Sequence, residues 1–502
     1  MNYIMTFDVG TTNTKAALVD LKGIVHKSCS VPMTVYHPQP NYSEQKPEEW
    51  WEAVSICSRK LMSEGSIKPG EVAGVGFSTL AMSITLVDEN SNLLLPASMI
   101  WMDERAEGEA ERLRNRFGGT RISEKLLGVK VTGHYWLPKY LWVKRYQNDL
   151  YRKARAVLDP IGYLCLRATG ELVCEWTQAS TTGLFDLKKK QWNDGIIRLM
   201  KLDRDKFMPL VKSTDKVGTL TAQAAKDMGL PESTPVFGGA TDAMAATVGS
   251  GISSTGEGVM ILGTSGNVAM LTDKKLTGYS GFASSQSGDP DKLYYVGTSN
   301  TTGACLSFAA NTLYGNENGT EEAYNRINED INAARPGADG LLFGPWMVGE
   351  RAPYPDGSLH GCFLNLKVNH TRQSIVRAIG EGIAHNYAVM LERMEKVYGA
   401  PIPTIRAVGG VTRNLVLMQI FADIMNRNIE VVRDASFGGS VGIALMSAAG
   451  LGEYSSVSEA AKVVQTEHRF EPNPQNRAVY DDAHKKFQRL YPAVAKWYHT
   501  AE

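Results

Sequence analysis

Short apolar runs alternate with glycine-containing turns in the N-terminal part of the chain. A run of roughly four to eight apolar residues bounded by Gly, Asp or Pro is typical of a strand. A helix is predicted at about 47–64, because Pro47 opens it and an acidic first turn follows. Strands followed by alternating helices and strands indicate an α/β layer fold. The predicted strands of this part lie at residues 3–9, 14–20, about 24–32, 72–77 and 84–88.

The same order of elements begins again in the second half. The segment GVMILGTSGNVAMLTD at 258–273 has an apolar run, a Gly-Thr turn and a second apolar run, as YIMTFDVGTTNTKAALVD has near the N-terminus. We therefore expect two similar α/β domains, 1–248 and 249–502, with the boundary near 245–256, where Gly and Ser are frequent. The other elements predicted for this half are a strand at 404–410 and helices at 371–398, about 414–427, 438–450 and about 477–498.

Composition and charge narrow the class of protein. The chain has 502 residues, and its 53 basic residues balance 53 acidic ones, so no global charge attracts nucleic acid or an anionic membrane. No apolar run reaches the length of about 18 residues that a membrane-spanning helix needs. The six cysteines are scattered, without the spacing of metal ligands. These features predict a globular, cytoplasmic protein without a nucleic-acid or membrane partner.

The turn DVGTTNT after the first predicted strand has the composition of a phosphate-binding turn. A glycine lets backbone N–H groups point at an anion, and neighbouring side chains add donors. Asp8 does not favour a phosphate, so we expect it to hold Mg²⁺, which accepts a carboxylate and bridges phosphate oxygens. An Asp-Gly hairpin turn with solvent-exposed threonines is the alternative. The candidate phosphate ligands are Gly10, Thr11, Thr12, Asn13 and Lys15.

A second turn of this type follows the first apolar run of the repeat. Gly263, Thr264 and Ser265 supply small residues and hydroxyls, as close approach of a backbone to phosphate requires. One such turn is weak evidence, whereas two in equivalent places suggest phosphates held by both halves. The pattern GxxxxGK[ST] is absent, and no GxGxxG follows the first strand. The predicted site is therefore neither a P-loop nor a Rossmann site.

Two further strand ends carry candidate chemistry. Asp242 ends PVFGGATD before a helix of small residues, where a carboxylate can accept the proton of a substrate hydroxyl that attacks phosphorus. The alternative role of Asp242 is to cap that helix. Gly409 and Gly410 permit a flat ring to lie on the backbone, so they are either an adenine and ribose site or a plain strand-to-helix turn. We expect the glycine-rich segment 435–450 to pack beside them.

Together these motifs resemble those of the FGGY carbohydrate kinases, ATP-dependent sugar kinases of the actin-like ATPase superfamily. The resemblance covers nearly the whole chain, and its strength lies in the order and spacing of the motifs. The segments that carry it are FDVGTTNTK near the N-terminus, WMDER at 101–105, LPKYLWVKRY at 137–146, GGATD at 238–242, GTSG at 263–266, ERAPYPDGSLHGCFLNLKVNHTR at 350–372 and GGVTRN at 409–414.

The resemblance implies an α/β protein with two RNase-H-like domains flanking a catalytic cleft, the sugar bound by the first domain and ATP largely by the second. By position, Asp242 would be the catalytic base and Asp8 would lie beside Mg²⁺. Thr11 and Thr12 would face the γ-phosphate. The residues that would contact the nucleotide are Gly263, Thr264, Gly409, Gly410 and Asn414.

The choice of sugar is predicted from one segment that keeps the motif of the family and one segment that departs from it. Trp101 of WMDER offers an apolar wall, unless it is a plain core aromatic, and Asp103 can accept from two hydroxyls. Xylulokinase-like members carry Gln-Met-His where this chain has Leu80-Ala81-Met82. Fewer side-chain donors are therefore available here to bond the hydroxyls of the sugar. We expect a ketopentose such as D-xylulose, with a sugar acid such as gluconate, a polyol, or a non-metabolic actin-like ATPase as alternatives. The oligomeric state that we consider for this chain is a homodimer. The candidate substrate contacts are Ala81, Met82, Trp101, Asp103 and Asp242.

Overall fold

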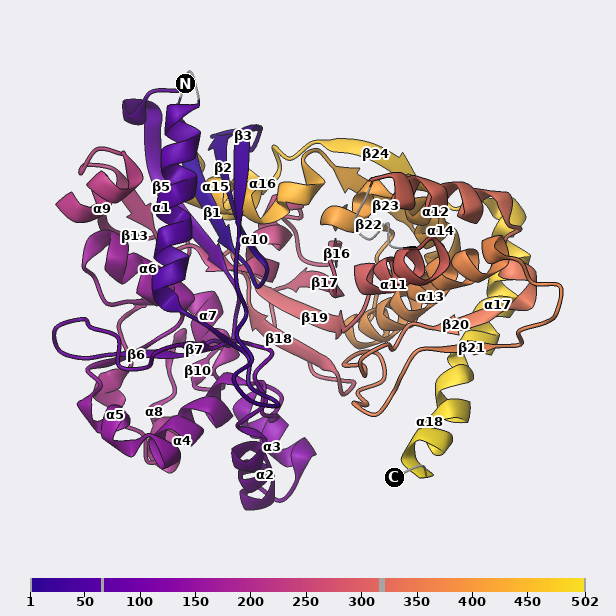
Figure 1. Cartoon of the computed structure of the whole chain (residues 1–502), viewed down its shortest axis with the longest axis horizontal. Coiled ribbons are helices and arrows are strands. Elements are labelled where there is room, and N and C mark those ends of the chain that lie inside the picture. Colours follow the sequence, from indigo (N-terminus) through magenta and orange to yellow (C-terminus); the bar gives the residue numbers. More distant parts are fainter. Residues whose placement is uncertain (1, 65–66, 316–320, 501–502) are drawn as a thin grey trace. The chain divides into compact units, whose positions relative to one another are not determined.

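A computed structural model of the chain describes residues 2–64, 67–315 and 321–500. The described residues form two compact units, whose elements are labelled in Figure 1. The first unit takes in a segment from the second half of the sequence, Phe437–Val464. The predicted division of the sequence into the domains 1–248 and 249–502 stays a prediction. The first unit consists of Met1–Ser253, Ser285–Leu293 and Phe437–Val464, and the second of Ser254–Ser284, Tyr294–Ser436 and Gln465–Glu502.

A seven-stranded sheet forms the centre of the first unit. Its strands are β1 (Tyr3–Val9), β2 (Asn13–Asp20), β3 (Val25–Pro32), β5 (Val72–Thr79), β13 (Lys216–Thr219), β14 (Pro235–Phe237) and β15 (Ala240–Thr241). The order is β13-β14-β5-β1-β2-β3, and β15 pairs with the end of β5. The central strand β1 pairs antiparallel with β2 and parallel with β5. The strands predicted near the N-terminus are confirmed, including the short β6 (Thr85–Val87).

Helices cover the sheet of the first unit. Helix α1 (Pro47–Ser63) packs on β2 and β3, and its bounds confirm the prediction for 47–64. Helices α10 (Asp242–Gly249) and α15 (Gly438–Gly450) pack against each other. Their backbones approach so closely that a Cβ on Gly442 would lie 1.8 Å from the carbonyl oxygen of Ala245. Glycine is therefore required where these helices cross, and this packing ties α15 to the first unit.

The start of the segment 435–450 lies beside Gly409, because the carbonyl of Ala435 accepts a 2.7 Å hydrogen bond from the N–H of Gly409. The rest of the segment, helix α15, belongs to the first unit and packs there on α10, β1 and β5. For this part, the expected place beside Gly409 and Gly410 stays a prediction.

A second buried core in the first unit holds the loops around the candidate sugar residues. Its helices are α2 (Glu107–Arg116), α3 (Thr120–Leu127), α4 (Trp136–Tyr146), α5 (Asn148–Lys153), α7 (Trp176–Thr181) and α8 (Asp194–Leu199). Aromatic residues of this core, among them Trp136, Tyr140 and Phe207, contact one another. The chain leaves the first sheet after β5, builds this core, and returns to the sheet at β13.

The second unit repeats the central pairing of the first. Its sheet contains β16 (Gly258–Leu262), β17 (Gly266–Thr272), β18 (Phe282–Gln286), β19 (Leu293–Ser299), β22 (Thr404–Val408), β23 (Asn428–Val432) and β24 (Thr466–Phe470). Strand β16 pairs antiparallel with β17 and parallel with β22, as β1 pairs with β2 and β5. The helices α11 (Gly303–Leu313), α12 (Glu321–Ala333), α13 (Arg372–Tyr398) and α14 (Leu415–Met425) belong to this unit. The predicted repeat of an α/β domain is confirmed.

The C-terminal helix predicted at 477–498 is divided into two. Helix α17 spans Arg477–Gln488 and α18 spans Leu490–Thr500. The division lies just before Pro492, whose nitrogen carries no hydrogen and which is tolerated only in the first turn of a helix. The prediction of one continuous helix was wrong at this point, because the apolar periodicity continues across the proline.

Candidate active site

Asp8 lies near the end of β1, with a hydroxyl beside it on the neighbouring strand. In the register of β1 and β5, Asp8 lies opposite Ser78, and the Ser78 hydroxyl donates a 2.9 Å hydrogen bond to Asp8 Oδ1. Lys15 lies opposite Asp8 on β2. Burial raises the pKa of Asp8, while the Ser78 hydrogen bond and the charge of Lys15 lower it. Strand register therefore places Lys15 beside Asp8.

The first phosphate-type turn is closed by a backbone bond and held by a buried side chain. The N–H of Gly10 donates to the carbonyl of Asn13 at 3.1 Å. Thr12 and Asn13 are exposed, and the Asn13 amide donates to the Thr12 hydroxyl. On the interior side of the turn, the buried Gln45 side chain donates a 2.8 Å hydrogen bond to the Thr11 carbonyl. The polar groups of the turn are thus presented outward by a fixed backbone.

Asp242 is the first residue of α10, directly after β15. Its Oδ1 accepts a 2.7 Å bond from the N–H of Ala243, and the N-cap position belongs to Thr241. Solvent reaches the Asp242 side chain, yet the surrounding protein raises its pKa to about 6, and the negative charge of Asp8 also acts in this direction. Asp242 therefore bonds the N–H of the next residue but is not the N-cap that the capping alternative expected, and its charged neighbour is Asp8.

A buried chain of hydrogen bonds holds the backbone before Asp242. The N–H of Thr241 donates to the Thr177 hydroxyl at 2.8 Å, and that hydroxyl donates to the carboxylate of Glu175. Burial raises the pKa of Glu175 to about 8. Our sequence reasoning missed Glu175 and Thr177, because the contact joins residues 64 positions apart. They position the backbone from which Asp242 projects.

The carboxylates of Asp8 and Asp242 form an electrostatic pair that suits a cation. The pKa of each is raised, that of Asp8 by burial and that of Asp242 by the surrounding protein and by the like charge of Asp8. Within residues 2–64, 67–315 and 321–500, no group of three or more His, Cys, Asp and Glu side chains is placed to hold a metal ion. Mg²⁺ needs fewer protein ligands, since it keeps several waters and binds through one or two carboxylates. The residues present therefore fit Mg²⁺ better than a metal enclosed by protein ligands.

Trp101 joins the predicted sugar wall to the first phosphate-type turn. Its indole Nε1 donates a 3.0 Å hydrogen bond to the Thr11 hydroxyl. The Trp101 side chain is only half-buried, so it is not a plain core aromatic. The carbonyl of Trp101 lies 3.2 Å from Nδ1 of His134. The structure thus brings Trp101 and Thr11 together, as a site for sugar and phosphate requires.

Asp103 lies beneath the surface rather than in contact with solvent. Its carboxylate is fully buried and accepts hydrogen bonds from the N–H of Ser43 at 2.8 Å and from the guanidinium of Arg105. Arg105 also pairs with Glu44. Asp103 therefore fixes the loop that carries Trp101, and its expected contact with sugar hydroxyls stays a prediction.

The loop at 80–83 places only part of its side chains outward. Leu80 is 1% exposed, and its N–H donates to the carbonyl of Val9 at the end of β1. The Leu80 side chain therefore belongs to the interior. Ala81 and Met82 are half-buried, and Met82 has a φ of 59°, a left-handed conformation that is uncommon for Met. These two residues remain the candidates of this loop.

Lys139 connects the two loops of the predicted sugar site from inside. Its amine, wholly buried in α4, donates to the carbonyls of Met82 at 3.0 Å and Ile100 at 2.6 Å. Burial lowers the pKa of Lys139 to about 7, and the charge of Asp103 opposes that effect. Our sequence reasoning did not assign Lys139 a role. A single lysine within the apolar stretch WLPKYLWV was the signal that could have revealed it.

In the second unit, the turn between β16 and β17 is closed by backbone bonds. The N–H of Gly263 donates to the Ser265 carbonyl at 3.0 Å. The start of α11 is bonded to the same turn, since the N–H of Thr302 donates to the Thr264 carbonyl and that of Gly303 to the Gly263 carbonyl. The turn has the same place after its first strand as the Gly10 turn has in the first unit.

Gly409, Gly410 and Asn414 follow β22 in the second unit. Gly409 has a φ of 106°, and a Cβ there would lie 2.4 Å from the carbonyl of Leu262, so only glycine fits. No atom lies within 4 Å of a Cβ built on Gly410, which leaves room above the backbone. Asn414 Oδ1 caps α14 by accepting from the N–H of Leu417. Its Nδ2 is buried without a partner among the described residues.

Comparison with known proteins decides the family. The model of the FGGY family of carbohydrate kinases, N-terminal domain, matches residues 3–249, and the model of the C-terminal domain matches residues 258–451. The chain belongs to the FGGY family of carbohydrate kinases. It is therefore an enzyme, a sugar kinase that uses ATP as phosphoryl donor and a small-molecule sugar as acceptor. The two-domain α/β fold of the actin-like ATPases, expected from the motifs, is confirmed.

Individual relatives of this sugar kinase cover its whole length. The xylulose kinase of Lactococcus lactis subsp. lactis is 30% identical over 99% of this chain and 98% of its own. The gluconokinase of Bacillus subtilis is 27% identical over 98% of this chain and 94% of its own. The crystal structure of ligand-bound xylulose kinase from Lactobacillus acidophilus has a TM-score of 0.89 at 23% identity and 100% coverage of both chains, a likeness of fold.

In the described part of the chain, no helix of this FGGY kinase combines the length and the hydropathy that crossing a membrane demands.

Proposed function

We propose that this kinase phosphorylates D-xylulose, with Asp242 as the general base and Mg²⁺ held beside Asp8. The observation that carries the proposal is the place of Asp242 at the start of α10, where the surrounding protein and, to a lesser extent, the charge of Asp8 raise its pKa to about 6. At neutral pH such a carboxylate is ionised, yet it is a stronger base than an ordinary aspartate. Asp242 would therefore accept the proton of the sugar hydroxyl as that oxygen attacks phosphorus.

The other candidate residues have supporting roles in this proposal. Bound Mg²⁺ would neutralise charge on the phosphate oxygens. Asp8, kept in place by the Ser78 hydroxyl, would hold the ion. Lys15 and the exposed side chains of Thr12 and Asn13 would add positive charge and donors around the phosphates. Each of these groups is present in the first unit on a backbone that strand pairing fixes.

The nucleotide would be held by residues of the second unit. Gly263, Thr264 and Ser265 would present backbone N–H groups and hydroxyls to phosphates. Gly409 and Gly410 would leave space for the adenine and ribose, and the unpartnered Nδ2 of Asn414 would donate to the nucleotide. A buried amide that lacks a partner is costly, so a ligand that satisfies it would be favoured.

D-Xylulose is the proposed sugar because a xylulose kinase is 30% identical over nearly the whole chain. Ala81, Met82 and Trp101 would contact its carbon chain, and Asp103 would order the loop or accept from its hydroxyls. Gluconate is the second candidate, because a gluconokinase is 27% identical over a similar length. The cytoplasmic location and the homodimer stay predictions, which cell fractionation and light scattering test.

A substrate panel tests the choice of sugar. Initial rates of ADP formation are measured with D-xylulose, D-gluconate, glycerol and further pentuloses and hexuloses, at saturating Mg-ATP. We expect D-xylulose to give the highest kcat/KM, with related sugars within about a hundredfold, because an apolar wall discriminates by only about 1–3 kcal/mol per methylene-sized difference. A higher kcat/KM for D-gluconate would replace the proposed sugar but leave the kinase reaction intact.

A further inference from the structure

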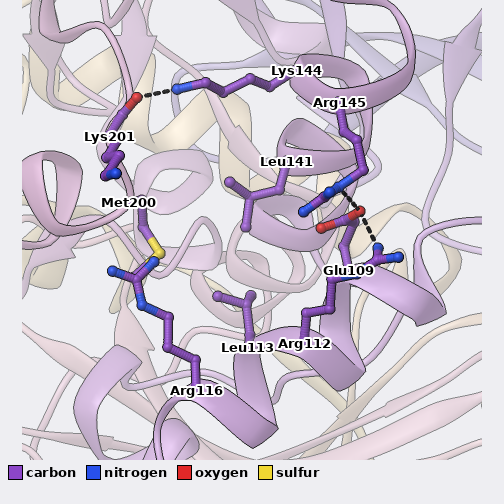
Figure 2. Close-up of a pocket in the computed structure, with 9 residues that line it drawn as sticks. All are labelled: Glu109, Arg112, Leu113, Arg116, Leu141, Lys144, Arg145, Met200 and Lys201. Carbon is purple, nitrogen blue, oxygen red and sulfur yellow. Dashed lines mark hydrogen bonds and ion pairs between the residues drawn. The ribbon is translucent and has the colours of Figure 1, made fainter.

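A hollow of about 400 Å³ lies in the first unit, lined by none of the candidate active-site residues. Its walls are α2, α4 and the turn that follows α8 (Figure 2). The volume falls within the range of pockets that hold small molecules. Neither the phosphate-type turns nor the sugar loop contributes to this hollow, so its chemistry has to be explained separately.

The lining of the hollow carries a large excess of positive charge. Its charged side chains are Glu109, Arg112, Arg116, Lys144, Arg145 and Lys201. The chain as a whole is neutral, so this concentration of cations is local. Burial lowers the pKa of Lys144, Asp203 opposes this effect, and the charge of Lys201 adds to the lowering. A concave surface lined by one sign of charge focuses the electrostatic potential and attracts the opposite charge.

Glu109 does not neutralise this charge but orients two of the arginines. Its side chain is only 4% exposed, and it binds Nε of Arg145 at 2.7 Å and NH1 of Arg112 at 2.5 Å. One buried carboxylate thus holds two guanidinium groups in place. Since Arg145 bonds through Nε, its two terminal nitrogens are left for other partners. A planar guanidinium with free N–H groups binds phosphate oxygens in pairs.

The positively charged side chains lie on two sides of the leucines that line the hollow. Figure 2 shows Arg116 and Lys201 on one side, Arg112 and Arg145 on the other, and Leu113 with a second leucine between them. Leu113 is buried at its base. A ligand that satisfied both sides would need anionic groups at two separate places and a carbon skeleton to cover the leucines.

We propose that this hollow binds a small organic anion with anionic groups at both ends of a short carbon skeleton, at least one of them a phosphate ester. The ligand lies across the leucines, one anionic group toward Arg116 and Lys201, the other toward Arg112 and Arg145. The proposal does not depend on the sugar or on the role of Asp242. It adds to the kinase a ligand site outside the candidate active site.

Titration calorimetry of the full chain tests the proposal, with 2,3-bisphosphoglycerate and inorganic phosphate as probes at fixed ionic strength. We expect one saturable site that binds 2,3-bisphosphoglycerate at least about tenfold more tightly than phosphate, because charge-assisted bonds at two places add. The double variant Arg116→Glu/Lys201→Glu should weaken that binding by about tenfold or more. The matched control, Lys188→Glu/Lys189→Glu, reverses two exposed charges outside the hollow and should bind as the wild type does.

Several results would overturn the proposal. They are the absence of saturable binding to the wild type, equal weakening in the control variant, and unchanged affinity in the hollow variant. Displacement of the probe by ATP would show that the probe occupies the nucleotide site, and this would also overturn the proposal. If the double variant does not fold by circular dichroism, Lys201→Glu alone is used, whose side chain is exposed. It should weaken binding several-fold, and unchanged affinity would again contradict the proposal.

Discussion

The indole N–H of Trp101 donates a 3.0 Å hydrogen bond to the hydroxyl of Thr11, a residue 90 positions earlier in the chain. Trp101 belongs to the predicted sugar wall, and Thr11 to the turn predicted to face phosphate. Gln45 bonds the carbonyl of the same threonine from the interior. The side chain proposed to contact the sugar is thus bonded to the segment proposed to bind the phosphates, so we expect a change in one to affect the other.

The coupling of Trp101 and Thr11 is tested by a double-mutant cycle. Trp101→Phe keeps an aromatic ring but removes the donor, and Thr11→Val keeps the shape but removes the acceptor. We expect each to lower kcat/KM for the sugar by about two- to tenfold, the equivalent of one neutral hydrogen bond. The double variant should be little worse than the more damaging single one. Strictly multiplicative losses would show that the bond does not connect the two functions.

Asp242→Asn should abolish most of the sugar phosphorylation. The amide cannot take up the proton of the attacking hydroxyl, and loss of a positioned general base costs roughly 10²–10⁴ in rate. The amide oxygen can still accept from the N–H of Ala243, so the melting temperature should change little. Nucleotide affinity, measured by calorimetry, serves as the control and should stay near that of the wild type. Turnover close to wild type would show that Asp242 only begins a helix.

Met82→His should change the ranking of sugars. Met82 is half-buried in the loop that the proposal places at the sugar, and a left-handed backbone is more easily adopted by His than by most residues. The imidazole adds a donor and acceptor, so we expect kcat/KM ratios across the sugar panel to shift by several-fold or more. Leu80→Met, a conservative change in the interior, is the matched control and should keep the ranking. If both variants keep it, this loop does not contact the sugar.

Lys139→Met should make stability less dependent on pH. The pKa of Lys139 is about 7 in the folded protein against an ordinary value of 10.5, so between these values the unfolded chain binds more protons. The free energy of unfolding of the wild type, relative to Lys139→Met, should therefore be level below pH 7. It should rise above pH 7 by at most about 1.4 kcal/mol per pH unit. Denaturant titrations from pH 6 to 9 measure this, and a constant difference would contradict it.

The same variant tests whether Lys139 positions the sugar loops. Its amine bonds the carbonyls of Met82 and Ile100, next to the candidate sugar contacts. We expect Lys139→Met to raise KM for the sugar several-fold while KM for ATP stays unchanged. Equal effects on both constants would indicate general damage to the first unit rather than a role at the sugar.

The local elements of this fold were predictable because their signals are local. Apolar runs and turn residues located β1, β2 and β3, and Pro47 marked the start of α1. The placement of Asp8 beside Lys15 needed only strand register. The likeness of the two halves also lay in short segments, in which an apolar strand leads into a turn of small residues with hydroxyls.

The supporting contacts of the site were not predictable in this way. The bonds of Gln45 to Thr11, of Thr177 to Thr241 and of Lys139 to Ile100 join distant parts of the chain. Polarity alone does not say whether a charged side chain faces a ligand or is buried with partners. For Asp103, the sequence did not reveal that Arg105 and Ser43 donate to its buried carboxylate, and its contact with the sugar stays a prediction.

The sugar dependence of ADP formation tests the central claim most directly. Purified protein is incubated with Mg-ATP, with and without D-xylulose, and the initial rate of ADP release is measured. We predict that D-xylulose raises the rate by at least about a hundredfold over the sugar-free rate, since the hydroxyl of the sugar is the acceptor that Asp242 is proposed to activate. A rate that is the same with and without D-xylulose, and with every other sugar of the panel, would contradict the account.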